Sequence, residues 1–145
     1  MTSLNEYSFA NYCTLLSISL SGIDNIPSNC FRNNTNIKQL SVNFGENSDI
    51  AIGPSAFIGC NDLTSFVMQL NNNANVSIGE CAFYGTSSID KIDFSKVVSI
   101  GPSAFNSSNI YSDIDDIIGI SLPNVLSIND FAFANNQKIS HIGIR

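Results

Sequence analysis

The chain has 145 residues, a formal net charge of −6 and 12% charged side chains. Six Lys and Arg against 12 Asp and Glu leave no basic stripe that could neutralise phosphates, which disfavours nucleic acid and anionic membrane surfaces as partners. No run approaches the roughly 20 apolar residues that a membrane-spanning helix needs, so we expect no membrane insertion and a single domain over residues 1–145.

One short phrase recurs along the chain. IGPSAF occurs at residues 52–57 and again at 100–105, and IGECAF lies between them at 78–83. Equivalents of its phenylalanine, which we call the marker phenylalanines, are Phe9, Phe31, Phe57, Phe83, Phe105 and Phe133, at intervals of 22, 26, 26, 22 and 28 residues. Internal periods of this length are typical of solenoids. Each copy is therefore predicted to form one coil, with the marker rings stacked in a ladder.

Each coil also contains strand signals. An aliphatic residue lies five positions before the marker, and an apolar-x-x-apolar-x-apolar phrase follows it, as in Leu63, Phe66 and Met68. The end of this phrase alternates as a strand does. Six short strands are predicted, side by side in one parallel sheet, over residues 17–21, 39–43, 65–69, 91–95, 119–123 and 141–145.

The turns between these elements have their own pattern. Extra residues lie in Gly- and Asn-rich turns at 43–49 and 71–75 and in the fifth coil around 108–115. The position three residues after the marker is mostly small and polar, which predicts side chains that pair with backbone groups at a bend. Gly53, Gly79 and Gly101 follow the aliphatic residue and suggest a position of positive φ.

Signals for chemistry are weak. The single histidine, His141, has no nucleophile and carboxylate arranged with it in the sequence pattern. Asp113, Asp115 and Asp116 could bind calcium but lack the glycine-enabled turn of such loops, so a solvated loop is the preferred interpretation. We expect no enzyme activity, no cofactor and no metal. Four cysteines at irregular spacing are predicted to be free structural thiols: Cys13, Cys30, Cys60 and Cys81.

The predicted sheet leaves an outward face as the candidate binding surface. Its side chains are short and weakly charged, which suits many modest hydrogen bonds to a polypeptide but offers no aromatic anchor. The alternative is that this face is only scaffold. The candidate binding residues are Gln39, Ser41, Ser65, Val67, Gln69, Lys91, Asp93, Ser121 and His141.

The segment IGPSAFIGCNDLTSFVM at 52–68 resembles the BspA-type, or Treponema pallidum-type, leucine-rich repeat. The resemblance covers essentially the whole chain, and the Ala-Phe pair recurs in four units. It implies a right-handed leucine-rich repeat solenoid of the α/β horseshoe class, mainly β with short strands or 3₁₀ turns, in about six repeats of 22–28 residues with a parallel β-sheet on the concave face. It also implies a non-catalytic protein-binding module at a cell surface, with adhesion to host or matrix proteins.

An alternative function is an intracellular or self-assembling repeat scaffold. The first 22 residues lack the basic n-region of a signal peptide, which favours the cytoplasm if Met1 is the native start. The sequence ends directly after the sixth strand phrase, which leads us to expect end-to-end self-association as a second partner interaction. Three glycosylation sequons begin at Asn33, Asn75 and Asn106 and are expected by chance in so Asn- and Ser-rich a chain.

Overall fold

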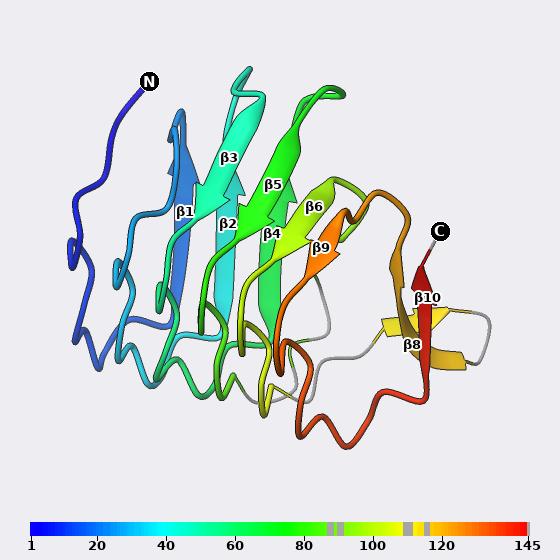
Figure 1. Cartoon of the computed structure of the whole chain (residues 1–145). Coiled ribbons are helices and arrows are strands. Elements are labelled where there is room, and N and C mark those ends of the chain that lie inside the picture. The colour runs from blue at the N-terminus through cyan, green and yellow to red at the C-terminus, as the bar shows by residue number, and fades with distance from the viewer. Residues whose placement is uncertain (87–88, 90–91, 109–111, 115–116, 145) are drawn as a thin grey trace.

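The computed structural model describes residues 1–86, 89, 92–108, 112–114 and 117–144. Within these ranges the chain winds as a parallel β-solenoid without helices, with strands on two opposite sides of the coils (Figure 1). The first coil lies at one end of the stack and β10 (His141–Ile144) at the other. This architecture confirms the solenoid predicted from the repeat.

One side of the solenoid carries a three-stranded sheet. Its strands are β1 (Ser17–Ser21), β2 (Gln39–Asn43) and β4 (Ser65–Gln69), in the order β1-β2-β4. All pairs are parallel, and Ser17, Gln39 and Ser65 lie side by side. Alternate side chains point into the core, as predicted for the first three coils.

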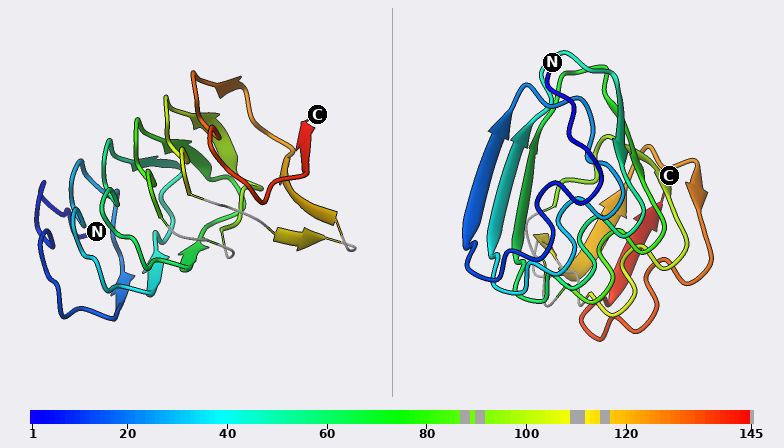
Figure 2. Two further views of the ribbon diagram at one scale, coloured as in Figure 1. Left: turned by 90° about the horizontal axis from the view of Figure 1, so that it is seen from below. Right: turned by 90° about the vertical axis from the view of Figure 1, so that its left-hand side faces the viewer.

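The opposite side carries a four-stranded parallel sheet, which we call the outer sheet (Figure 2). Each of its strands ends at the aliphatic residue that precedes the marker by five positions. The strands pair in the order β3 (Asp49–Ile52), β5 (Asn75–Ile78), β6 (Val97–Ile100) and β9 (Ser127–Ile128). Short strands opposite the first sheet, which the family resemblance implied, are therefore present.

The predicted single sheet of six strands is interrupted at the fourth coil. Among the described residues of that coil's phrase, 92–95 form no strand. Beyond it, β8 (Ile117–Leu122) pairs in parallel with β10 on one edge and antiparallel with β7 (Ser112–Ile114) on the other. The extra residues of the fifth coil thus form β7. This strand pairs with the edge of β8 with which a strand of the fourth coil would otherwise pair.

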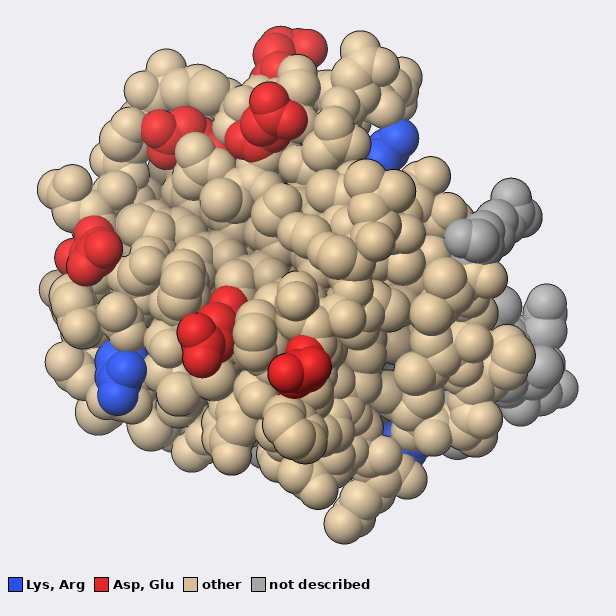
Figure 3. All heavy atoms as spheres, in the orientation of Figure 1, with Lys and Arg blue, Asp and Glu red and all other residues tan. Residues whose placement is uncertain are grey.

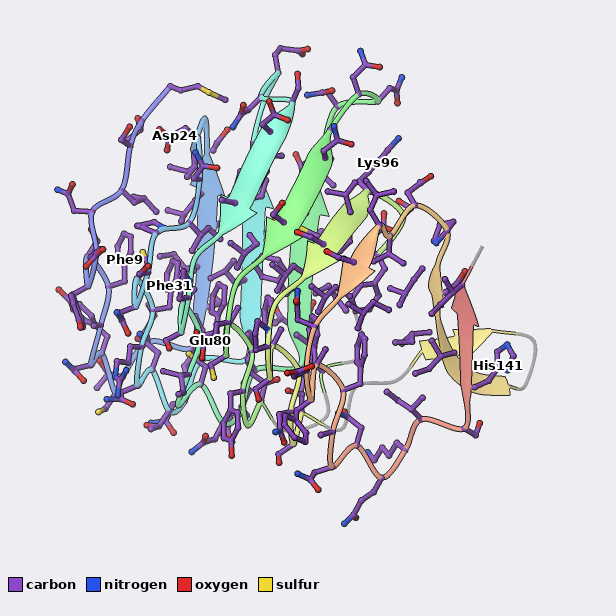
Figure 4. All side chains as sticks on the ribbon, viewed as in Figure 1. Phe9, Asp24, Phe31, Glu80, Lys96 and His141 are labelled. Atoms are coloured by element: carbon purple, nitrogen blue, oxygen red, sulfur yellow. The ribbon has the colours of Figure 1, made fainter. Side chains whose placement is uncertain are left out.

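The marker phenylalanines form the predicted ladder through the core. Ring centroids of successive markers are 5.2, 5.2, 4.9, 5.0 and 5.4 Å apart, and successive planes differ by 12° or less. Phe66 and Phe94 pack edge-on against this ladder from the side of the first sheet. The four central markers are fully buried. Figure 4 shows Phe9 and Phe31 side by side at the start of the column.

The bends around each marker depend on left-handed residues rather than 3₁₀ turns, which are absent from the described residues. Positive φ occurs two residues before and two residues after every marker, at Tyr7 and Asn11, Asn29 and Asn33, Ser55 and Gly59, Cys81 and Gly85, Ser103 and Ser107, and Phe131 and Asn135. Asn and Gly tolerate this conformation best, and they occupy five of the six later positions.

The positive φ expected at Gly53, Gly79 and Gly101 was wrong. These residues do not have left-handed backbones; instead, each lies against the backbone of the preceding coil. A Cβ on Gly53 would be 2.5 Å from the backbone nitrogen of Ser28, and a Cβ on Gly79 would be 2.8 Å from that of Pro54. Glycine is required here because the coils approach closely, not because the chain turns.

Polar side chains three residues after the marker pair with backbone carbonyls, as predicted. The amide nitrogen of Asn34 donates to the carbonyls of Phe9 (2.6 Å) and Phe31 (2.7 Å), thereby linking two coils. The Thr86 hydroxyl donates to the Phe83 carbonyl at 3.0 Å, and Ser108 bonds the same oxygen from the next coil. A buried polar column thus runs beside the aromatic one.

Candidate functional site

Nine outward side chains cover the sheet of β1, β2 and β4, and we call this surface the β1–β2–β4 face. Register places them in three rows across the strands. The rows are Ser17, Gln39 and Ser65; Ser19, Ser41 and Val67; and Ser21, Asn43 and Gln69. The predicted site residues Gln39, Ser41, Ser65, Val67 and Gln69 therefore lie together on one continuous surface.

This face is polar and uncharged. All nine side chains are exposed or half-buried, and eight are Ser, Asn or Gln, whose hydroxyl and amide groups both donate and accept hydrogen bonds. Val67 is 43% exposed and is the apolar member. An open depression of about 280 Å³ lies over the three strands, lined by Ser17, Ile18, Ser19, Gln39, Leu40, Ser41, Ser65 and Val67.

The other predicted site residues do not join this surface. Lys91 lies outside the described residues, and Asp93 is exposed on a segment that is not a strand. Ser121 lies on β8 and His141 on β10, where His141 pairs with Gly119. Figure 4 shows His141 at the C-terminal end of the solenoid, away from the β1–β2–β4 face. The interruption at the fourth coil therefore divides the predicted site.

A second depression on the outer sheet was not predicted. It has a volume of about 370 Å³ and is lined by Asp49, Ile50, Ala51, Asn75, Ser77, Val98 and Leu126. Its signal in the sequence was the alternation in DIAI and NVSI, which places Ala51 and Ser77 outward. Figure 3 shows this side of the molecule, where separate Asp and Glu side chains lie among neutral residues.

Asparagine amides connect the turns of neighbouring coils. The Asn47 amide nitrogen donates to the Asp24 carbonyl at 2.7 Å, and that of Asn71 donates to the Asn47 carbonyl at 2.7 Å. Asn124 makes the equivalent bond to the Ser95 carbonyl at 2.6 Å. The Asn-rich turns are thus held to one another, and these amide groups make internal hydrogen bonds rather than bonds to a ligand.

All four cysteines are free, as predicted, but Cys13 is exposed rather than part of the core. Burial raises the pKa of Cys60 to about 12 and that of Cys30 to about 11. Since a thiolate is the reactive form, these two thiols are unreactive at neutral pH. Among the described residues, no three His, Cys, Asp or Glu side chains are grouped to hold a metal. Of the acidic cluster, Asp113 lies on β7, and Asp115 and Asp116 lie outside the part of the chain that the structure describes.

The described part of the chain contains no helix of the length and apolarity needed to span a membrane. Its parallel coils, aromatic ladder and repeated strand phrase define a leucine-rich repeat solenoid. The model of the BspA-type leucine-rich repeat region matches residues 1–76 and 50–145, with six copies. The chain therefore belongs to the BspA-type leucine-rich repeat family.

Among solved structures, the chain is similar to a leucine-rich cell-surface protein of Faecalibacterium prausnitzii. The two share 19% sequence identity with a TM-score of 0.39. The match covers 99% of this chain and 58% of the other, so the chain spans little more than half of that protein's length. A search of curated proteins finds no match.

Proposed function

We propose that the chain is a non-catalytic module that binds a polypeptide on the β1–β2–β4 face. The observation that carries this proposal is the set of nine exposed or half-buried positions, in register on three parallel strands and over one open depression. Leucine-rich repeats are generally interaction modules, and eight of the nine side chains on this face carry hydrogen-bonding groups.

The chemistry of this face indicates how a ligand is held. Serine hydroxyls and the amides of Gln39 and Gln69 can pair with the main-chain groups of an extended polypeptide, and Val67 provides an apolar contact on the edge strand β4. None of the nine side chains is charged, so affinity should change little with salt. The specific form of binding that we propose, from the family resemblance, is adhesion to a host or matrix protein at a cell surface.

The proposal is tested with a panel of purified extracellular-matrix proteins immobilised on a biosensor. The whole chain is compared with the double variant Ser41→Arg, Ser65→Arg, which places two bulky charges on the β1–β2–β4 face. The matched control is Ser77→Arg, on an exposed position of β5 in the outer sheet. Circular dichroism of each variant establishes that it is folded.

The expected result is that at least one matrix protein binds the wild type and the Ser77→Arg control equally well and binds the double variant at least about tenfold more weakly, which is a loss of about 1.4 kcal/mol. Equal binding by a folded double variant would exclude this face. Absence of binding across the panel would contradict adhesion to matrix proteins.

A further inference from the structure

The outer sheet turns an apolar side chain toward solvent where its register shifts. β5 and β6 pair Val76 with Val97 and Ser77 with Ser99, so Val98 is an extra residue on β6. An extra residue of this kind changes the direction of a side chain. Val98 is half-buried and lines the depression of about 370 Å³ on the outer sheet. The register shift therefore adds an aliphatic group to the outward side of this sheet.

The next coil repeats this arrangement. The segment VVSI at 97–100 aligns with VLSI at 125–128. Leu126 thus takes the position equivalent to Val98, and its N–H donates to the Val98 carbonyl at 2.8 Å. Both side chains line the depression. Two neighbouring coils therefore present an aliphatic side chain at the same outward position.

The other half of the depression is polar and acidic. On β3 and β5, Asp49 pairs with Asn75 and Ala51 pairs with Ser77, and all four residues are exposed. The backbone of Asp49 bonds to the Asn47 side chain, but no hydrogen bond or ion pair among the described residues engages the Asp49 carboxylate. The depression thus has a carboxylate at one end, small side chains in the middle and aliphatic side chains at the other end.

The acidic side chains around this depression form no ion pair among the described residues. Glu46, in the turn before β3, and Glu80, beyond the end of β5, are both exposed. Lys96 directly precedes β6, but its ammonium group donates to the Asn72 carbonyl at 2.8 Å. Figure 3 shows Asp and Glu side chains above and below a neutral band on this side, and Figure 4 shows Glu80 below the outer sheet. A cationic side chain is therefore the complementary group for a ligand here.

The strand spacing defines how far apart the complementary groups of a ligand must be. From β3 to β9 the sheet has three strand-to-strand steps of about 4.8 Å, so Asp49 and Leu126 lie roughly 14 Å apart across the strands. An extended polypeptide advances about 3.3 to 3.6 Å per residue, so roughly four residues span this distance. Side chains four positions apart in an extended segment point to the same side.

We propose that the outer-sheet depression binds an extended segment of a partner polypeptide that carries a Lys or Arg and an aliphatic side chain four positions apart. The cation pairs with the Asp49 carboxylate, and the aliphatic side chain packs on Val98 and Leu126. The side chain midway between them lies over Ala51 and Ser77. This site is on the opposite side of the solenoid from the β1–β2–β4 face, and it is independent of the function proposed for that face.

The test is selection of a phage-displayed library of random peptides on the immobilised whole chain. The expected result is enrichment of peptides that carry a basic and an aliphatic residue four positions apart. The enriched peptides are then synthesised, and their affinity is measured by fluorescence anisotropy at low and high sodium chloride. Because one contact is an exposed ion pair, the affinity should fall as the salt concentration rises.

Three variants locate the binding site of these peptides. Ser77→Arg places a bulky cation in the middle of the depression and should weaken binding at least about tenfold, and Leu126→Ser should weaken it by removing the apolar contact. Asp49→Asn should weaken binding about two- to fivefold, as expected for one exposed ion pair. The matched control is Asp62→Asn, which removes an exposed carboxylate in the turn before β4 and should leave the affinity unchanged.

The β1–β2–β4 face provides a second control. The double variant Ser41→Arg, Ser65→Arg should bind the enriched peptides as the wild type does, and circular dichroism establishes that every variant is folded. Absence of enrichment, enrichment of peptides without a basic residue, or equal binding of all enriched peptides to folded Ser77→Arg overturns the proposal. Because the two surfaces are blocked by different variants, failure of one proposal is distinguishable from failure of the other.

Discussion

The rings of Phe57 and Phe83 stack with their centroids 4.9 Å apart and their planes 12° from parallel. These two residues are 26 positions apart in the sequence, and their contact is repeated by every neighbouring pair of markers. Since each coil contacts its neighbours alone, the stability of the solenoid is approximately a sum over such joints. Substitutions at equivalent positions can therefore be compared directly along the stack.

Phe83→Ala should destabilise the chain far more than Phe9→Ala. The ring of Phe83 is fully buried between two markers and touches Phe66 edge-on, so its removal leaves a cavity and should cost about 3 to 5 kcal/mol. Phe9 stacks on Phe31 alone and is half-buried, so its loss should cost about 1 to 2 kcal/mol. Urea unfolding measures both values, and equal losses would contradict the ladder.

Gly53→Ala should be more disruptive than Gly85→Ala. The new Cβ at position 53 meets the backbone of the preceding coil at 2.5 Å, which rotation of a side chain cannot relieve, and we expect a loss of about 3 kcal/mol. Gly85 has a φ of +73° but nothing within 4 Å of a Cβ, so only backbone strain of about 1 kcal/mol is expected. If the order of the two losses in urea unfolding is reversed, turn geometry rather than coil spacing is the dominant constraint.

Asn34→Ala should destabilise the junction of the first two coils. It removes two hydrogen bonds and leaves the partly buried Phe9 carbonyl without its described side-chain donor, at a cost of about 1 to 3 kcal/mol. Asn34→Thr should cost less, because Thr86 occupies the equivalent position and because the Asn34 Oδ1 has no partner among the described residues. Thermal unfolding of the two variants makes the comparison; no difference between them would mean that packing, not hydrogen bonding, matters at this site.

Thiol reactivity should separate exposed Cys13 from buried Cys30 and Cys60. At pH 8, a disulfide reagent should modify exposed Cys13 quickly, while Cys30 and Cys60 react only when the chain unfolds, because burial raises the pKa of each thiol. Mass spectrometry of the labelled peptides gives the order of modification. Rapid labelling of Cys60 in the folded chain would contradict its burial.

The same burial sets a pH dependence of stability. A thiol whose pKa rises from 9.0 to about 12 on folding stays protonated in the native state while the unfolded chain ionises. The free energy of unfolding should therefore hold its full contribution from Cys60 below pH 9 and lose it between pH 9 and about 12. Cys60→Ala should reduce this decline, as measured by urea unfolding at several pH values.

The features of the fold that the repeat imposes directly could be predicted from the sequence. The marker column and the register of the first three strands follow from period and alternation, because equivalent residues of stacked coils must coincide. The outer sheet was expected only as unspecified short strands, since segments such as DIAI are too brief for periodicity to identify. The left-handed positions at Tyr7, Cys81 and Phe131 depend on the bend and not on residue type, so composition gave no signal for them.

The interruption of the first sheet could not be predicted for a different reason. The sequence around 108–115 was interpreted as a solvated loop, whereas Ser112–Ile114 forms β7 and pairs antiparallel with β8. Whether β7 or a strand of the fourth coil pairs with the free edge of β8 depends on tertiary packing. The local sequence pattern carries no information about that packing. As a result, five of the nine predicted site residues lie together, and Ser121 and His141 lie on a separate group of strands.

The unequal continuity of the two sheets affects the mechanics of the solenoid. In the part of the chain that the structure describes, β3, β5, β6 and β9 pair in sequence with one register shift between Val76 and Ser77, while β4 and β8 on the other side are not paired with each other. A solenoid whose coils are joined by strand pairing on one side only bends most easily about that side. We therefore expect the curvature between the first three coils and the last two to change more readily than within either group, because no strand pairing between β4 and β8 has to be broken.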